Sequence, residues 1–522
     1  MSLTINQLAN NPKTFVEKVI KETSSHAASR LLAVISFENI TPTLIGGYNA
    51  ATGSLELELA ESVRLTEIKG LWRWWARALL LGCEGKQSLK NVKEVCEKVA
   101  ELLGSTRSPS KVELRLHMER DTCELFKNRK DHLYKVAKAY SRREVDKEIQ
   151  KSSSKHGDRN SSYTATSRGQ IADEFNKLVE SIPRTKIIGM GVPYNKKKIK
   201  DEAQREVIDE KKKEIMAEEN AKALVNKLFV FCPGELRGKI EVYEYLHGKG
   251  GLGKSERNFL VGSLLVALTF GGIGAITSRG FGAISLSCEY VGKDVEEKFK
   301  EITRRIFEEK NEENVKEVEK SLVELVKCTL KYGKELFSVP AQCEMSTIPS
   351  TIPEYPTADP ENNVLRIEVV SVNAEKPFEL LEKIGKATLK NEWKKNAKSS
   401  PKKSGSFHTW ILGLPRMQHG KGYYYKGKGD ESRRRSAINI RPIVPLKKRN
   451  VWLVAVYGFL SKDWNVENLV HKGKTEKKVK DYEIIKCDVV SEKIGQDKIL
   501  DDEKFIEGVF NAAFCFVKKL LR

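Results

Sequence analysis

Three cations stand at helical spacing in one apolar stretch and could bind phosphate. Lys69, Arg73 and Arg77 lie four residues apart within IKGLWRWWARALLL, residues 68–81. Residues four apart share one face of an α-helix, so the pattern predicts a helix with an outward basic row, anchored by its tryptophans and leucines. Trp74 lies at the edge of that row, where an indole could stack on an unpaired base. Phosphate binding and an ordinary solvated basic face are equally consistent with this helix.

A glycine-rich segment, GGIGAITSRGFG at residues 271–282, is the second candidate site. Backbone without Cβ atoms can approach a sugar-phosphate chain closely and offer N–H groups to its oxygens. Arg279 would add a full positive charge. A helix C-cap followed by a turn is the alternative, but five glycines and an arginine exceed what capping needs, which favours binding. The candidate glycines are Gly271, Gly272, Gly274, Gly280 and Gly282.

The third candidate is a basic stretch at residues 415–449, in which eleven Lys or Arg residues face only Asp430 and Glu431. Three consecutive tyrosines, residues 423–425, lie within it. Cations interleaved with aromatic rings suit a single-stranded nucleic acid, because phosphates need charge and unpaired bases need a stacking surface. A flexible, merely soluble loop is the alternative. The candidate residues are Arg416, Tyr424, Arg433, Arg434 and Arg435.

A competing motif, GKGGLGKS at residues 248–255, satisfies the phosphate-loop pattern GxxxxGK[ST] between a strand and a helix. In that interpretation Lys254 reaches the terminal phosphates and Ser255 holds magnesium. The surrounding sequence argues against it, because a phosphate-loop domain needs further βα units and a strand that ends in a magnesium-binding Asp. A P-loop NTPase is therefore the alternative to a binding protein.

No pattern predicts a catalytic, metal or cofactor site. His26, His117, His247 and His408 are isolated in sequence, and a lone histidine is more often an ordinary surface or core residue than a catalyst. The nine cysteines are scattered without a CxxC pair, which indicates reduced thiols. We expect no catalytic residues, no metal and no cofactor.

The charge of the chain requires an anionic partner. The 522 residues carry a formal net charge of +21, with a pI of about 9.3, which suits nucleic acid or an anionic membrane. The longest uncharged run, residues 259–278, is broken by glycines and predicts a buried helix followed by a loop, not a membrane span. The first twenty residues lack the pattern of a secretory leader. We therefore expect a cytoplasmic protein without membrane contact.

The remaining pattern predicts two α+β domains. Strand-like runs and two helices between residues 31 and 291 follow the order of a βαββαβ unit. Residues 120–225 interrupt that order with a charged, helical, solvated insertion. A charged helical linker, residues 293–336, leads to a second unit with strands at 364–372 and 438–460, a helix at 378–398 and a closing helix near the end. The domains are 1–292 and 293–522, and their weak internal similarity suggests a duplication.

These motifs together resemble the RAMP-superfamily proteins that form the first subunit of the Cmr, or type III-B, CRISPR effector complex. The similarity rests on ITPTLIGG, IKGLWRWWAR, ELLGS before a strand, GGIGAITSRGFG, and ILGLPR followed by RRRSAI. Each motif is short, but their order and spacing make the set specific, and together they cover about half of the chain. The insertion and the phosphate-loop-like segment lie outside it.

The resemblance implies two ferredoxin-like (RRM-like, RAMP) domains and a non-catalytic subunit that contacts the 3′ part of the crRNA and helps to capture target RNA for antiviral defence. Other Cmr subunits are its implied partners and do the cutting. Carried over, the family's basic helix falls on Lys69, Arg73 and Arg77, its glycine loop on residues 271–282, and its second-domain motif on Arg416 and residues 433–435. A RAMP endoribonuclease that processes crRNA is a further alternative, with His26 as its candidate residue.

Overall fold

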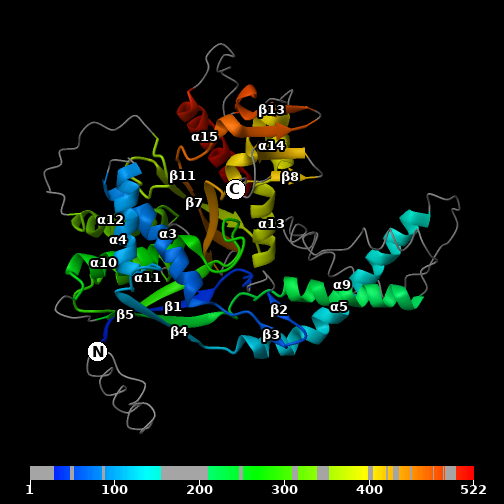
Figure 1. Cartoon of the computed structure of the whole chain (residues 1–522), viewed down its shortest axis with the longest axis horizontal. Coiled ribbons are helices and arrows are strands. Elements are labelled where there is room, and N and C mark those ends of the chain that lie inside the picture. The colour runs from blue at the N-terminus through cyan, green and yellow to red at the C-terminus, as the bar shows by residue number, and fades with distance from the viewer. Residues whose placement is uncertain are drawn as a thin grey trace, which may run out of the picture.

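The computed structural model has mixed helices and antiparallel sheets, the expected α+β class (Figure 1). Its helices and sheets alternate in layers, from the sheet that contains β1 to the helix α15. The structure describes residues 29–46, 52–84, 89–153, 210–245, 251–308, 315–337, 352–397, 404–414, 416–418, 421–426, 434–446, 450–473, 475–485, 487 and 501–522.

The first sheet has four strands in the order β4-β5-β1-β6, and every neighbouring pair is antiparallel. Strict alternation decides which face is buried: along β5, every second residue from Gly238 to Glu244 points into the core. The strands are β1 (Ser29–Asn39), β4 (Val112–Met118), β5 (Arg237–Tyr245) and β6 (Ile284–Val291). A short pair, β2 (Gly53–Ser54) and β3 (Leu59–Ala60), lies beside them.

Helices cover the inner face of this sheet. Trp72 and Trp75 are buried, and Trp72 Nε1 donates a hydrogen bond to Ser263 Oγ at 2.8 Å, which fixes the rotation of α3 against α10. The helices are α3 (Leu65–Glu84), α4 (Leu89–Leu103), α10 (Lys254–Val266) with its π-helical end η2 (Ala267–Gly271), α11 (Lys298–Phe307) and α12 (Val315–Glu335). Helices α11 and α12 occupy the expected linker, but they pack into the core through residues such as Phe299 and Leu325.

The insertion begins and ends in two long helices, α5 (Thr122–Ser153) and α9 (Glu210–Leu228), which pack against each other and project away from the sheet as an arm (Figure 1). At its base, the ring of Phe126 packs on Phe229 and both are buried. Farther out, Lys138 pairs with Glu214 and Glu218 at 2.7 Å each. The arm is thus joined to the core at one end and held by ion pairs beyond it.

The second sheet, in the order β10-β11-β7, is antiparallel and is buried on both faces. One face packs on α12 and α3 and shares their hydrophobic core, to which Ile367 and Phe459 contribute. The other face packs on α13 and α15. The elements are β7 (Leu365–Asn373), β10 (Ile438–Leu446), β11 (Val451–Phe459), α13 (Pro377–Ala387), α14 (Lys390–Asn396) and α15 (Asp502–Leu521).

Two features of this half differ from expectation. The helix expected at 378–398 is two helices, because the chain turns at Thr388 and Leu389. Part of the basic stretch at 415–449, for which a flexible loop was the alternative, belongs to a third antiparallel sheet, in the order β13-β12-β9-β8. Its strands are β8 (Arg416–Gln418), β9 (Lys421–Tyr425), β12 (Leu469–Lys472) and β13 (Glu476–Lys478).

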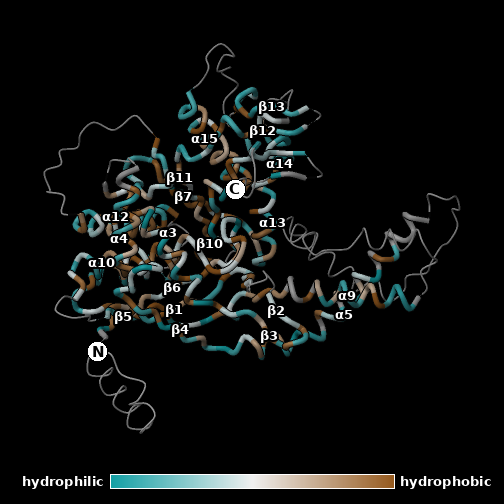
Figure 2. Tube along the Cα trace, in the orientation of Figure 1, coloured by the Kyte–Doolittle hydropathy of each residue, from teal (hydrophilic) through white to brown (hydrophobic). Residues whose placement is uncertain are grey.

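Short 3-10 turns border this sheet: η4 (Ser404–Phe407), η5 (Thr409–Leu412), η7 (Val466–Asn468) and η8 (Val479–Asp481). Figure 2 shows hydrophobic residues concentrated toward the centre, near α3 and β10, with more hydrophilic residues at the periphery around β12 and β13. Within the described ranges, no helix combines the length and hydrophobicity needed to cross a bilayer. The apolar helix α10 is instead buried from Asn258 to Val266.

A buried arginine joins the two halves. Arg441 of β10 is 1% exposed, and its guanidinium donates to the carbonyl oxygens of Thr269 (3.0 Å), Gly282 (2.9 Å) and Leu268 (3.3 Å). Two of these carbonyls belong to η2, so the cation lies at the negative end of the helix formed by α10 and η2. Burial lowers the Arg441 pKa to about 10. Arg441 is one of the eleven basic residues counted at 415–449, and its burial removes that charge from the surface.

Replacing Arg441 by Leu should lower the free energy of unfolding by about 3 kcal/mol or more, because three carbonyl oxygens in the core each lose a charged donor. Urea denaturation followed by circular dichroism measures the change. The matched control is Arg435→Leu, which removes the same charge from an exposed position and should change stability by less than about 0.5 kcal/mol. Equal effects of the two substitutions would contradict the structural role of Arg441.

His408 is a buried histidine that the fold holds neutral. Its Nδ1 accepts a hydrogen bond from Trp410 Nε1 at 3.2 Å, and its Nε2 lies 3.0 Å from the carbonyl oxygen of Glu483. If Nδ1 gained a proton, its N–H and the Trp410 N–H would both be donors and the hydrogen bond between them would be lost. Burial lowers the His408 pKa to about 4.

The unfolded chain should therefore bind a proton between about pH 6.5 and 4 that the folded chain does not. We expect stability to fall as the pH drops through this window, by about 1.4 kcal/mol per pH unit for this one group. Denaturation at a series of pH values measures the slope. It should become shallower in His408→Gln and stay unchanged in His117→Gln, whose imidazole is exposed; unchanged slopes in both would refute the assignment.

Candidate nucleic-acid interface

The basic row on α3 is present and is only partly exposed. Trp72 and Trp75 fix the buried side of the helix, which leaves Lys69, Arg73 and Arg77 half-buried beside each other. Burial lowers the Lys69 pKa, and the neighbouring Arg73 charge lowers it further. Within the described residues, no Asp or Glu carboxylate forms an ion pair with any of the three. Among the described residues, the row is thus a group of crowded positive charges without carboxylate counter-charges.

Arg73 is held more firmly than the other two. Its guanidinium donates to the Leu103 carbonyl oxygen at 2.8 Å, at the C-terminal end of α4, where the helix dipole favours a cation. Its Nε has no hydrogen-bond partner in the part of the chain that the structure describes. Lys69 and Arg77 have no such anchor there. Arg73 therefore has a structural contact with α4, and its unpartnered Nε is buried.

Trp74 joins the two halves of the chain. Its indole is half-buried and meets the ring of Phe459, on β11, edge to face at 5.4 Å between centroids. The Trp75 ring packs on Phe459 as well. The structure thus gives Trp74 a packing role, and stacking on a base stays a prediction for its remaining exposed area.

The glycines of the 271–282 loop are required by internal packing. Four of them, Gly272, Gly274, Gly280 and Gly282, have φ between 60° and 90°, which disfavours other residues. An added Cβ would lie 1.8 Å from the Ile273 oxygen at Gly282 and 2.4 Å from the Leu44 oxygen at Gly274. At Gly271 the Cβ would strike Leu71 instead. Protein atoms therefore occupy the space that we expected to be open to a phosphate chain. The contacts favour the alternative, a helix C-cap followed by a turn.

Arg279 is also a correction. We expected its charge to face a phosphate, but the side chain is 1% exposed. Its guanidinium donates to the carbonyl oxygens of Leu412 (2.5 Å) and Ile438 (3.1 Å) and lies 3.3 Å from Ser436 Oγ. All three acceptors belong to the second half of the chain. Arg279 is therefore a side chain of the first half bound to carbonyls of the second half, whereas Arg441 is a side chain of the second half bound to carbonyls of the first.

The glycine loop links the two basic regions. At one end, Gly274 N donates to the Glu67 carboxylate of α3 at 2.6 Å. At the other end, Arg279 reaches Ser436, the residue after Arg435. Arg435 is exposed and has no ion pair within the described ranges. The sequence did not predict this role for Glu67, because the contact forms only when the folded loop lies opposite its carboxylate.

The other second-domain candidates are mostly engaged within the protein. Arg416 donates to the Thr388 carbonyl oxygen at 2.7 Å, at the end of α13. Arg434 pairs with Asp463, and its guanidinium lies 4.8 Å from the centroid of the Trp464 ring. Arg433 lies outside the described residues. The charge available to a ligand is therefore smaller than the sequence count suggests.

The tyrosine triplet follows the alternation of β9. Tyr423 is 1% exposed and donates to the Gly405 carbonyl oxygen at 2.7 Å. Tyr424 points to the opposite face and donates to Glu476 of β13, whereas Tyr425 is half-buried. Strand geometry thus divides the three rings between two faces, which a flexible loop would not do. Contact of Tyr424 with a base stays a prediction.

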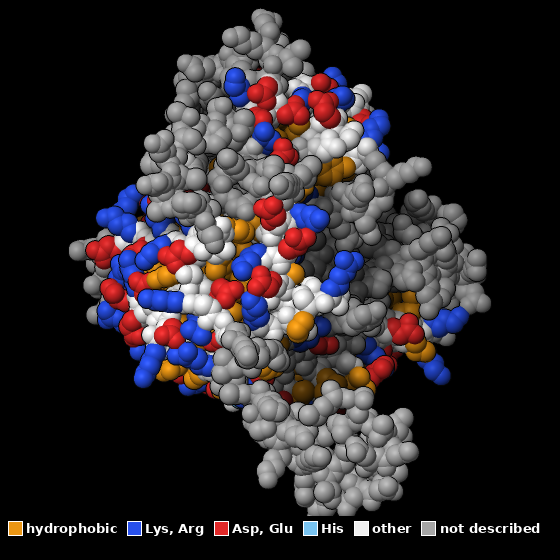
Figure 3. Space-filling model, turned by 60° about the vertical axis from the view of Figure 1, so that its left-hand side comes forward, with side chains coloured by type: hydrophobic (Ala, Val, Ile, Leu, Met, Phe, Trp, Pro, Cys, Tyr) orange, Lys and Arg blue, Asp and Glu red, His pale blue; other side chains and the backbone are white. Residues whose placement is uncertain are grey.

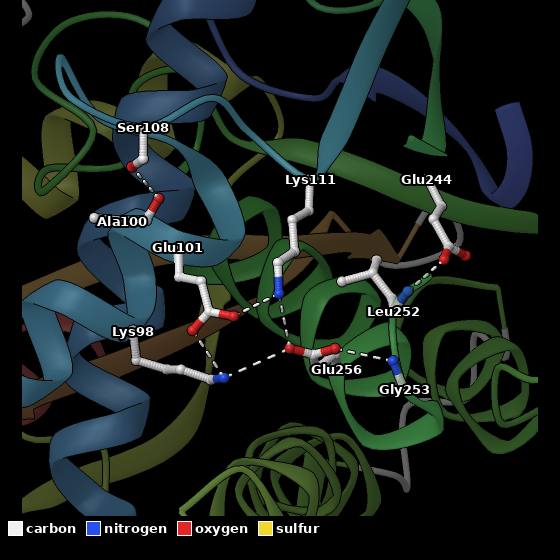
Figure 4. Close-up of polar contacts among 9 residues, drawn as sticks. All are labelled: Lys98, Ala100, Glu101, Ser108, Lys111, Glu244, Leu252, Gly253 and Glu256. Atoms are coloured by element: carbon white, nitrogen blue, oxygen red, sulfur yellow. Dashed lines mark hydrogen bonds and ion pairs between the residues drawn. The ribbon is translucent and has the colours of Figure 1, made fainter. Parts of the chain in front are cut away.

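The described end of the phosphate-loop-like segment is occupied by carboxylates. Leu252 N donates to the buried Glu244 at 2.6 Å, and Gly253 N donates to Glu256 at 2.9 Å (Figure 4). These N–H groups would have to face a phosphate in a nucleotide site. Lys254 is exposed, and residues 246–250 lie outside the description. The strand before the helix also belongs to an antiparallel sheet, which departs from the phosphate-loop context.

Around this segment the charges are balanced. Glu256 and Glu101 are bridged by Lys111 (3.3 and 2.5 Å) and by Lys98 (3.5 and 3.1 Å), as Figure 4 shows. On the side of the molecule that carries α10 and α12, basic and acidic side chains interleave without a patch of one sign (Figure 3). The row on α3 differs from these surroundings because its cations have no carboxylate partners among the described residues.

The histidines and cysteines show no catalytic grouping where the structure describes them. No group of three His, Cys, Asp or Glu side chains there could hold a metal ion. His117 lies 3.3 Å from Glu241 on the open face of the first sheet, and His408 is in the core. His26 and His247 lie outside the described residues.

Known proteins resemble this chain in sequence over about half of its length. The sequence profile of the RAMP superfamily matches residues 36–285. The CRISPR system CMR subunit Cmr1 of Saccharolobus solfataricus is 29% identical over 273 residues, which are 49% of this chain and 54% of that protein. The match thus spans about half the length of this curated relative.

Solved structures match over more of the chain. A chain of the type III-B Cmr-beta complex, determined by cryo-EM with cognate target RNA, AMPPnP and ssDNA, has a TM-score of 0.53 at 16% identity, covering 94% of this chain and 98% of its own. The apo crystal structure of Cmr1 from Pyrococcus furiosus has a TM-score of 0.38 at 16% identity, covering 83% and 88%. The resemblance expected from the motifs is confirmed: residues 36–285 match the RAMP superfamily, about half of the chain is similar in sequence to Cmr1, and the fold is similar to that of a chain in a type III-B Cmr complex.

Proposed function

We propose that this chain is a non-catalytic RNA-binding subunit of a cytoplasmic type III-B CRISPR effector complex. In this role it contacts the 3′ part of the crRNA and helps to capture target RNA, while other subunits cleave. The observation that carries the proposal is the row of Lys69, Arg73 and Arg77, three adjacent cations without a carboxylate partner among the described residues. The likeness to Cmr1 and to the target-bound Cmr-beta structure supports it.

The electrostatics of the row favour a phosphate ligand. Partly burying like charges next to each other raises their free energy, which the lowered Lys69 pKa reflects. A phosphate oxygen beside the row would relieve this repulsion. A ribose-phosphate strand supplies such oxygens at regular intervals, so that one strand could contact successive turns of α3.

The domains in this proposal are ferredoxin-like RAMP units, residues 1–292 and 293–522. The first sheet supports the assignment, because its order β4-β5-β1-β6 is that of a βαββαβ unit once the arm is set aside. The second sheet has the same central arrangement, β10-β11-β7, in three strands. Helices α11 and α12 lie between the sheets, and a strand of RNA would follow the seam beside them, near Arg435 and the glycine loop.

Replacing Lys69 and Arg77 together by Ala should weaken binding of single-stranded RNA by about tenfold or more at low salt. It should also reduce the slope of log K against log salt by about 1.4, since two phosphate contacts are lost at about 0.7 each. Filter binding across a salt series measures both. Arg73 is left intact because its contact with Leu103 would confuse binding with stability.

The matched control is Lys254→Ala with Lys293→Ala, which removes two exposed cations elsewhere on the first domain. It should leave the affinity and the slope nearly unchanged. If both double variants bind RNA like the unsubstituted protein, the row on α3 is a solvated helix face and the proposed site is wrong. If both lose affinity equally, the interaction depends on net charge alone.

A further inference from the structure

A second group of positive charges lies in the C-terminal half, away from α3 in sequence. Lys390, at the start of α14, places its Nζ 3.1 Å from His471 Nε2 of β12 and 3.3 Å from Tyr423 Oη of β9. The same Nζ lies 4.7 Å from the centroid of the Tyr423 ring. Tyr482 Oη lies 3.4 Å from His471 Nδ1 on the far side of the imidazole. We call Lys390, Tyr423, His471 and Tyr482, with Arg416 beside them, the Lys390 cluster.

The neighbours of Lys390 are neutral or cationic. His471 is 6% exposed, and burial lowers its pKa to about 4, so that it is neutral at physiological pH. Burial, reinforced by the charge of Arg416, lowers the Lys390 pKa to about 8. In the described ranges, no Asp or Glu carboxylate pairs with the Lys390 ammonium. Among the described residues, the Lys390 ammonium is therefore a partly desolvated charge without a carboxylate partner.

Other lysines of the same half show how unusual this is. Lys386, four residues before Lys390, pairs with Glu382 at 2.7 Å, and Lys395, five residues after it, pairs with Glu392 at 2.8 Å. Lys480 pairs with Glu467 at 2.7 Å as well. A structural lysine in this region thus has a carboxylate partner close by. Leaving a charge partly buried without one costs free energy that packing alone does not repay.

The hydrogen bonds leave Lys390 able to bind one more acceptor. An ammonium has three N–H donors, and two of them are directed to His471 Nε2 and Tyr423 Oη. Tyr423 Oη in turn donates to the Gly405 carbonyl, so its oxygen lone pairs face Lys390. His471, Tyr423 and Arg416 are each fixed by a strand of one sheet, which holds the lysine in place. This is a prearranged donor with a second cation nearby.

We propose that the Lys390 cluster binds a phosphate group through the remaining Lys390 N–H, with the Arg416 charge assisting. Phosphate is the chemical class that fits, because it is anionic, accepts several hydrogen bonds and occurs both free and at the end of or within an RNA strand. The site is distinct from the row on α3 and does not rest on the RNA-binding role proposed for that row. A bound phosphate stabilises the ammonium form, so it raises the Lys390 pKa.

Competitive acetylation of the intact protein, read by mass spectrometry of the Lys390 peptide, tests the proposal. Only the neutral amine reacts, so the labelling rate at pH 8 reports its fraction. We expect inorganic phosphate to slow labelling of Lys390 severalfold compared with NaCl at equal ionic strength, and to leave exposed Lys395 unchanged. Unchanged Lys390 labelling with phosphate and with every RNA described next would overturn the proposal.

Three RNA oligonucleotides of one sequence identify the source of the phosphate: one with a 5′-phosphate, one with a 3′-phosphate and one with hydroxyls at both ends. Protection by one phosphorylated end only identifies a terminal phosphate, and equal protection by all three identifies an internal one. The Lys69 and Arg77 double variant is tested with inorganic phosphate. We expect it to retain protection of Lys390, so failure of the α3 site and failure of this site are separable.

A thermal-shift measurement provides an independent check. Phosphate should raise the melting temperature of the unsubstituted protein and of Lys395→Gln. It should not do so in Lys390→Gln, whereas Lys390→Arg, which keeps the charge, should recover part of the shift. A phosphate-dependent shift that persists in Lys390→Gln would show that the anion binds elsewhere.

Discussion

The reciprocal exchange of two buried arginines is the interaction on which the rest of the structure depends. Arg441, from the second half, is bonded to carbonyls at the end of α10 and η2, and Arg279, from the first half, is bonded to carbonyls around η5 and β10. Both arginines are 1% exposed, and backbone carbonyls accept from both guanidiniums. A guanidinium fork tolerates little displacement of its acceptors, so the pair fixes how the halves face each other. Hydrophobic packing of Trp74 and Phe459 alone would allow sliding.

This constraint explains the glycine loop and the position of the candidate interface. The loop must pass between the two guanidiniums, and Gly272 leaves no room for a Cβ beside Arg441. Its ends are bonded to Glu67 and to Ser436. The basic row on α3 and the exposed Arg435 are consequently held by one rigid connection, even though they are more than 350 residues apart in sequence.

Much of the fold was predictable, because local patterns decide it. Alternating or continuous apolar runs located β5, β7 and β11. The four-residue spacing of the basic row on α3 predicted which face of that helix carries the cations. The fates of Arg279 and Arg441 were not predictable, since a sequence shows a charge but not the carbonyls that will surround it. The third sheet was missed because β8 and β13 have only three residues each. The residues of the Lys390 cluster come from separate elements of the chain, so no local spacing in the sequence predicts the cluster.

The second sheet is covered on both sides, and this has a consequence for how the protein can be divided. One face completes the core around α12, and the other completes the core around α15. A cut between the two proposed units would expose the apolar flanks of α3 and α10 on one fragment. It would expose the surfaces of α12 and the second sheet that pack on them on the other. Neither fragment would keep its shape alone, so the chain should melt in one step, and residues 1–292 expressed by themselves should aggregate.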